Sequence, residues 1–159
     1  MFSYRGHLGD EKLRHSSSVA SLMYERALEL TGDAVFADDM FLLGFLHDIG
    51  YIYGGEGHAD SGAALLARNG YRFVNAVRNH SDALVDGDDS LPDILLKWCD
   101  MSVLPNGEVV SISERLHDIE NRYDEGSDVI SAARKTAKWL FRHLPKRYLT
   151  DEESASAER

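Results

Sequence analysis

A histidine and an aspartate stand side by side in one of the most apolar segments of the chain. His47 and Asp48 lie within Leu46-His-Asp-Ile-Gly50. Burying an imidazole and a carboxylate there costs free energy unless another group satisfies them. A divalent cation would do so, because imidazole nitrogen and carboxylate oxygen are ligands for Fe, Mn, Zn, Co and Ni. Adjacent side chains on a helix point about 100° apart, so both could bind an ion lying between them. Taken alone, the doublet is also compatible with a helix-terminal pair whose histidine is partly exposed.

Three more histidines and one aspartate stand at positions where they could join this doublet. His15 lies 32 residues before His47, His58 follows a glycine-rich loop, His80 ends a later helix, and Asp100 stands between large apolar residues. Each also has a structural explanation: a histidine bound to a backbone carbonyl at 15 and 80, a helix cap at 58, and a buried salt bridge at 100. Helical bundles build metal sites from inward-facing His and carboxylate side chains on several helices. The set as a whole therefore predicts a metal centre.

The elements that position these residues are predicted to be helices. Apolar residues recur at helical spacing nearly throughout, and no stretch alternates convincingly with a period of two. Gly32, Pro92 and a capping-box pattern of Ser111 with Glu114 mark helix ends. The expected helices cover residues 10–30, 37–51, 58–69, 71–80, 92–101, 111–123 and 127–144. The sequence thus predicts an all-α fold, a single bundle of six or seven helices over residues 1–145, followed by a polar, frayed tail over 146–159.

Composition and charge narrow the class of partner. The chain has 159 residues, which suits one domain, and its 17 Lys and Arg against 27 Asp and Glu give a net charge of −10. This balance argues against a general binder of nucleic acid or of an anionic membrane. A small anionic substrate would need a local positive centre, such as a metal ion. The single Cys99 excludes an intramolecular disulfide, and no targeting segment or membrane span is visible, so we expect a cytoplasmic protein. The sequence indicates no oligomeric state.

The order of these residues resembles the HD-domain superfamily of metal-dependent phosphohydrolases. The resemblance rests on His15, on FLHDIG around the doublet and on KWCDMSV around Asp100, and it spans about residues 10–125. The strings GHADSGAALL from Gly57 and VRNHSD from Val77 also resemble binuclear members, whose pattern is H…HD…H…H…D. The resemblance implies two ions that are bridged by a carboxylate. In such members the ions are often iron and sometimes manganese. The implied first-ion ligands are His15, His47, Asp48 and Asp100, with Asp48 bridging to a second ion held by His58 and His80.

The function that the resemblance implies is hydrolysis of a small phosphoester or nucleotide. A bound divalent ion lowers the pKa of water toward neutrality, and His47 and Asp48 would be the central catalytic residues. Arg78, Lys97 and Arg115 are the candidates for binding the phosphate.

Two positions differ from many members of the superfamily. Tyr51 stands just after HD-x-G, where many members carry a lysine, and Ser18 stands three residues after the first histidine, where many carry a basic residue. These differences leave a non-catalytic module that binds a nucleotide or a partner as one alternative. A second alternative keeps the site, because some proteins of the HD fold with the same ligand order are di-iron oxygenases that cleave C–C or C–P bonds with O₂.

Overall fold

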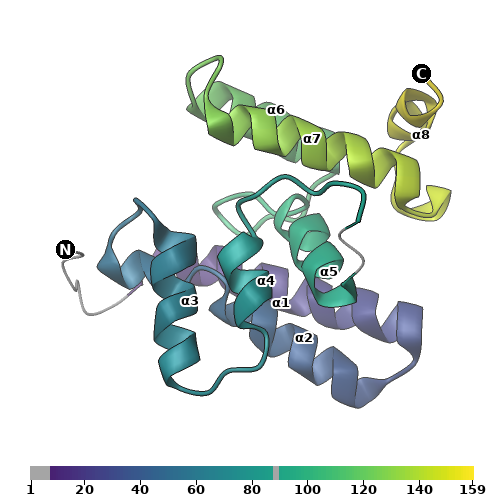
Figure 1. Ribbon diagram of the computed structural model, residues 1–159. Coiled ribbons are helices and arrows are strands. Elements are labelled where there is room, and N and C mark those ends of the chain that lie inside the picture. The colour runs from purple at the N-terminus through teal and green to yellow at the C-terminus, as the bar shows by residue number, and fades with distance from the viewer. Residues whose placement is uncertain (1–7, 88–89) are drawn as a thin grey trace.

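Two helices joined by a short turn form the base of the structure. In the computed structural model, which describes residues 8–87 and 90–159, α1 (Asp10–Thr31) and α2 (Ala34–Leu46) pack side by side (Figure 1). Helix α1 ends because Gly32 adopts a left-handed conformation (φ 66°) and its N–H donates to the Leu28 carbonyl at 2.9 Å. Gly44 lies at the contact, where a Cβ atom would be 2.8 Å from the Cα of Ala20. Only glycine permits this close approach of the two helices.

Three shorter helices complete the part of the bundle that carries the predicted ligands. They are α3 (His58–Arg68), α4 (Val74–Asn79) and α5 (Leu91–Asp100). A short 3₁₀ helix, η1 (Ile49–Tyr53), joins α2 to the loop before α3. Helix α3 contacts η1 and α4, and α5 contacts α1, α2 and α4. The core between them is apolar and includes the fully buried side chains Val19, Met23, Met40, Leu43 and Leu95.

A second layer of helices lies across one end of this bundle. Helices α6 (Ile112–Arg122) and α7 (Asp128–His143) run beside each other above α4 and α5 in Figure 1. Helix α6 begins with the predicted capping box, in which Ser111 accepts from the Glu114 N–H at 3.1 Å and Glu114 accepts from the Ser111 N–H at 2.9 Å. The chain ends in the 3₁₀ helix η2 (Lys146–Tyr148) and in α8 (Asp151–Ala157), which packs against α7.

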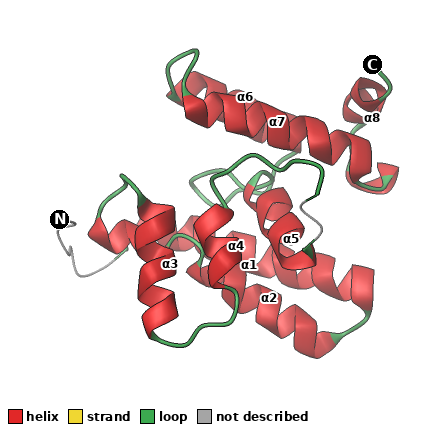
Figure 2. Ribbon diagram, viewed as in Figure 1, coloured by secondary structure: helices red, strands yellow, loops and turns green. Residues whose placement is uncertain are grey.

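The all-α prediction is confirmed for the described residues. Their ordered elements are eight α-helices and two 3₁₀ helices, and the β pairing is limited to an isolated bridge between Val103 and Val109 (Figure 2). The seven expected helices correspond to α1–α7. Within the same residues, no helix combines the length and apolar character needed to cross a membrane.

The predicted end of the second helix is wrong. The second helix does not continue to Tyr51 but stops at Leu46, and the chain tightens into η1. Gly50 is packed so closely on α3 that a side chain at this position would clash with the backbone of His58. A continuous helix through Tyr51 would not bring Gly50 into this contact.

The frayed tail expected over residues 146–159 is likewise not observed. Thr150 and Glu153 form a second capping box at the start of α8. The Glu153 side chain is buried, and one of its oxygens accepts from the Ser113 N–H at 2.8 Å and from the Ser113 hydroxyl at 2.9 Å. The tail is ordered because this carboxylate satisfies donors at the start of α6, a contact between residues 40 positions apart.

Candidate metal centre

The six predicted ligands come together where five helices meet. His15 lies on α1, His58 begins α3 and Asp100 ends α5. His47 and His80 cap the C-terminal ends of α2 and α4, and Asp48 directly follows His47. Four of these side chains are buried in the middle of the bundle: His15, His47, Asp48 and His80. Two overlapping groups of three have ligand atoms close enough to share an ion, namely His15, His47 and Asp100, and His47, Asp48 and His80.

All four histidines are oriented in the same way. Each Nδ1 atom lies next to a backbone carbonyl oxygen, at 2.6 Å for His47 and His80 and at 3.1 Å for His15 and His58. A carbonyl oxygen only accepts, so Nδ1 carries the proton in each ring and Nε2 is free to act as a metal ligand. The carbonyl-bound histidine considered for positions 15 and 80 is therefore observed, and the same bond directs Nε2 toward the cluster.

Local structure explains two of these bonds. His47 and His80 both cap the C-terminal end of a helix, and their Nδ1 atoms reach the carbonyls of Gly44 and Val77, three residues earlier. Carbonyls in the last turn of a helix lack their usual partner four residues later, so they are available to such a donor, and the Val77 carbonyl accepts from the His80 backbone N–H at 3.4 Å as well. Ending α2 at Leu46 thus fixes the orientation of the His47 ring.

Asp48 lies between two pairs of histidines. Its Oδ2 atom is 3.4 Å from Nε2 of His47 and 4.0 Å from Nε2 of His15. Its Oδ1 atom is 3.3 Å from Nε2 of His80 and 3.5 Å from Nε2 of His58. The two oxygens of one carboxylate therefore face separate pairs of imidazole nitrogens.

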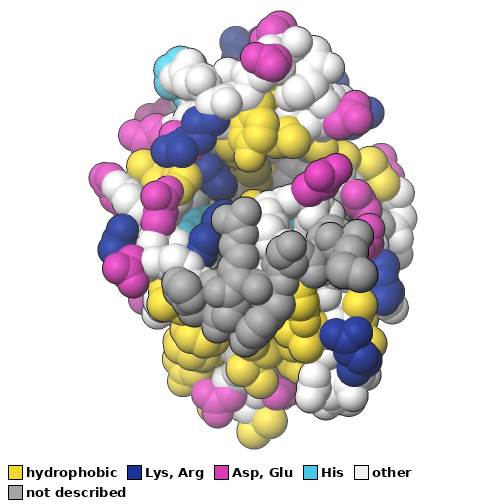
Figure 3. Space-filling view, turned by 90° about the vertical axis from the view of Figure 1, so that its left-hand side faces the viewer, with side chains coloured by type: hydrophobic (Ala, Val, Ile, Leu, Met, Phe, Trp, Pro, Cys, Tyr) yellow, Lys and Arg dark blue, Asp and Glu magenta, His cyan; other side chains and the backbone are white. Residues whose placement is uncertain are grey.

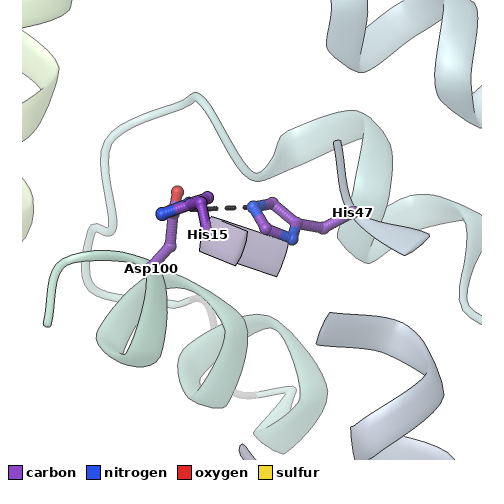
Figure 4. A group of neighbouring side chains, drawn as sticks. All are labelled: His15, His47 and Asp100. Atoms are coloured by element: carbon purple, nitrogen blue, oxygen red, sulfur yellow. Dashed lines mark hydrogen bonds and ion pairs between the residues drawn. The ribbon is translucent and has the colours of Figure 1, made fainter. Parts of the chain in front are cut away.

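Asp100 completes the group around the Oδ2 side of Asp48. Its Oδ1 atom is 2.8 Å from Nε2 of His15 and 3.6 Å from Nε2 of His47. Figure 4 shows these three side chains gathered from α1, the end of α2 and α5. The buried salt bridge considered for Asp100 has histidine partners and belongs to the same cluster.

The donor atoms fit a divalent cation. The Nε2 atom of His47 is buried and has no hydrogen-bond partner among the described residues. With Nδ1 protonated, the Nε2 atoms and the carboxylate oxygens of Asp48 and Asp100 are all acceptors, and acceptors do not satisfy one another. A cation at their centre removes this conflict, and imidazole with carboxylate is a donor set that suits transition metals.

Without a cation, the cluster must hold protons instead. Burial would lower the pKa of His47, but the neighbouring carboxylates of Asp48 and Asp100 raise it to about 9. Burial would raise the pKa of Asp48, but His47 and His80 hold that pKa well below its ordinary value. The pKa of Asp100 is likewise held low, against the effect of burial, by its bonds to His15 and His47. The protein thus maintains two carboxylates in their charged form inside the bundle.

A cavity of about 290 Å³ opens onto the cluster. Figure 3 shows histidine side chains in the middle of this face of the molecule, beside Lys and Arg side chains. Lys97 and Arg115, two of the predicted phosphate-binding residues, line the cavity. Lys97 is buried, and Arg115 pairs with Asp118 at 2.9 Å.

The structure does not bring the third predicted phosphate-binding residue, Arg78, to the cavity. Its side chain is exposed on α4 and donates to Asn75 at 2.9 Å. Arg78 and His80 are two positions apart, and that spacing turns two helical side chains about 200° apart. Because His80 faces the cluster, Arg78 faces away from it.

Lys12 is a cavity residue that the sequence analysis missed. Its Nζ atom lies 3.6 Å from Oδ2 of Asp48 and 3.7 Å above the centre of the Tyr51 ring, and Tyr51 in turn stacks on His58. Burial would lower the pKa of Lys12, but Asp48 and Tyr51 raise it, so the ammonium stays charged. The available signal was spacing, because a residue three positions before His15 shares its helical face.

Comparison with known families agrees with this geometry. The family model described as HD domain matches residues 13–102, more than half of the chain. Among curated proteins and among solved structures, no similar protein was found. The matched segment contains all six residues of the cluster and stops before α6 and α7. The chain therefore belongs to the HD domain family.

Proposed function

We propose that this protein is a metal-dependent phosphohydrolase whose centre holds two divalent cations, iron or manganese, with Asp48 as the bridging ligand. The observation that carries the proposal is the position of Asp48, whose Oδ2 faces His15 and His47 and whose Oδ1 faces His58 and His80. One carboxylate between two imidazole pairs is suited to a pair of ions. The HD domain family, in which metal-dependent phosphohydrolases are common, supports the same reaction class.

The proposed chemistry divides between the metal and the protein. When bound, divalent ions lower the pKa of water and offset the charge of a phosphoryl group. The protein supplies further positive charge around the cavity, from Lys12 next to Asp48 and from Lys97 and Arg115 on α5 and α6. These side chains bind the oxygens of the phosphate and orient the ester, because ammonium and guanidinium groups form charge-assisted hydrogen bonds with phosphate. A small anionic substrate is thereby compatible with a chain of net charge −10.

His15 and His47 also keep the carboxylates ionised. In the metal-free protein, the bonds from His15 and His47 hold the pKa of Asp100 low, so this carboxylate is already ionised at neutral pH when an ion binds. The backbone carbonyls that accept from the four Nδ1–H groups fix the ring orientations. Such bonds behind a ligand histidine raise its basicity and set its tautomer.

Elemental analysis of protein purified without oxygen tests this proposal first. We expect about two transition-metal ions per chain, and release of phosphate from small phosphoesters by the loaded protein. Asp48→Asn should lose both ions and the activity, whereas substitution of the exposed His117 to Ala should change neither. O₂ consumption with a turnover that requires iron would replace hydrolysis by oxygenase chemistry at the same residues. Protein that contains no metal and takes up none on titration would overturn the proposal.

A further inference from the structure

The cavity over the metal centre has two ends of different chemistry. One end carries the His and Asp cluster with Lys12 and Arg115. The other end is formed by α6 and α7. Its lining is apolar at Ile119, Val129, Ala132 and Ala133 and polar at Arg122, Tyr123 and Thr136. In Figure 3, hydrophobic side chains gather on the side of the hollow where α6 and α7 lie.

The polar side chains near the apolar end already have partners. Arg122 binds the carboxylate of Asp118 at 2.9 Å, and the same carboxylate binds Arg115 of the metal end at 2.9 Å. The Thr136 hydroxyl oxygen accepts from the Leu84 N–H at 3.0 Å. Ser81 and Asp82 also line the cavity, on the segment that runs from His80 to Leu84. The Tyr123 hydroxyl is the remaining polar group of this lining on α6 and α7, so the α6–α7 end offers little to the several hydroxyl groups of a sugar, which need hydrogen bonds when they leave water.

The exposure of the lining side chains at the α6–α7 end also favours an apolar ligand group. Val129 is 45% exposed although it lines the cavity, whereas Ile119 in the same lining is only 7% exposed. An apolar side chain that borders a cavity and remains exposed gains free energy when an apolar ligand group covers it.

Size limits the ligand as well. An apolar cavity of about 150 Å³ holds one benzene molecule. The cavity here measures about 290 Å³ and must also hold the phosphate. Within its walls it therefore has room for a phosphate with one ring-sized group.

We infer that the substrate is a phosphomonoester of a small apolar alcohol or phenol, with the phosphate at the metal end and the apolar leaving group against α6 and α7. This inference rests on the proposed function and adds the class of leaving group. Hydrolysis breaks the bond between phosphorus and the ester oxygen, water supplies the new oxygen on phosphorus, and the leaving group departs with a proton as the alcohol. Because α6 and α7 lie outside the matched segment 13–102, this specificity belongs to the part of the chain beyond the family match.

Binding of phosphonates, which are not hydrolysed, tests the inference without relying on turnover. Isothermal titration of metal-loaded protein would compare inorganic phosphate, methylphosphonate, phenylphosphonate and adenosine 5′-monophosphate. We expect phenylphosphonate to bind about tenfold more tightly than methylphosphonate, because the ring leaves water at the α6–α7 end. Equal affinity for the two phosphonates, or tighter binding of the nucleotide, would overturn the inference.

A substitution in the wall links this preference to α7. Val129→Ser should reduce the preference for phenylphosphonate about threefold and leave the affinity for inorganic phosphate unchanged. Val35→Ser, the same change at a 72% exposed position on α2 outside the cavity, is the matched control. Ala132→Phe should fill the apolar end and abolish the preference while phosphate still binds. An unaltered preference in both wall variants would contradict the inference alone. Failure of inorganic phosphate to bind the metal-loaded protein would instead count against the proposed function.

Discussion

The Nε2 atoms of His58 and His80 face each other at 3.1 Å, while the Nδ1 atom of each ring lies next to a backbone carbonyl. Both Nδ1 atoms donate, so both Nε2 atoms present lone pairs toward Oδ1 of Asp48. A proton or a cation is needed between such groups. Burial lowers the pKa of His58, which favours its neutral, ligating form over a charged one.

Replacing His80 should remove one ion and keep the other. His80→Ala deletes one of the two imidazoles that face Oδ1 of Asp48, while His15, His47 and Asp100 remain around Oδ2. We expect about half of the wild-type metal content by elemental analysis and a large loss of phosphatase activity. His117→Ala, a change at an exposed histidine on α6, should keep the full content. A His80→Ala protein with unchanged metal would show that this side chain is not a ligand.

Lys12 should contribute to phosphate binding. Its Nζ atom lies 3.6 Å from Asp48 at the mouth of the metal end, so Lys12→Met removes one positive charge next to the phosphate. A hydrogen bond to a charged group is worth about 1.5–3 kcal/mol, so KM and the inhibition constant of inorganic phosphate should rise about tenfold or more.

Two measurements control for indirect effects of Lys12→Met: the metal content of the variant and the KM of a matched variant. Lys138→Met, on an exposed part of α7 away from the cavity, should leave KM unchanged. If Lys12→Met instead lowered kcat at constant KM, or released metal, Lys12 would act on the ligands and not on the phosphate.

The stability of the metal-free protein should fall as the pH rises. The pKa of His47 is about 9 in the folded protein and near 6.5 in the unfolded chain. A pKa raised by folding gives stability that is fully present below pH 6.5 and is lost as the pH rises through about 9. In the loaded protein the ion takes the place of the proton, and metal binds more tightly as the competing proton leaves.

Thermal unfolding of loaded and chelator-treated protein checks this prediction. The difference between their Tm values should widen between pH 6.5 and 9, the interval set by the two pKa values of His47. A difference that narrows over the same interval would mean that His47 is not protonated in the metal-free protein.

The C-terminal helix should stabilise the wall of the cavity through one carboxylate. The buried Glu153 accepts from the backbone and hydroxyl of Ser113 at the start of α6. Glu153→Gln removes the charge from these bonds and should lower the free energy of unfolding by about 1.5–3 kcal/mol, measured by chemical denaturation. Glu152→Gln, at the neighbouring exposed position, should change it little. Equal effects of the two substitutions would argue against a specific role of Glu153.

The sequence was sufficient for the fold class, for most helix ends and for the six cluster residues. Apolar spacing predicted seven helices, and Gly32, Pro92 and the Ser111 capping box marked ends that the structure confirms. These signals are local, because a helix end depends on conformational preference and hydrogen bonds within a few residues. His15, His47 and Asp100 could be singled out because a polar side chain on an apolar helical face must have a partner.

Only the tertiary structure decided how those residues face one another. Lys12 and Asp48 are 36 positions apart, and their contact follows from the packing of α1 beside α2. The direction of Arg78 away from the cavity depends on which face of the short helix α4 is buried. The ordered conformation of the C-terminal tail depends on Glu153, which accepts a hydrogen bond from Ser113, 40 positions earlier. Spacing along a helix gives the relative directions of its own side chains, but the distances between atoms on different helices are set by how the helices pack.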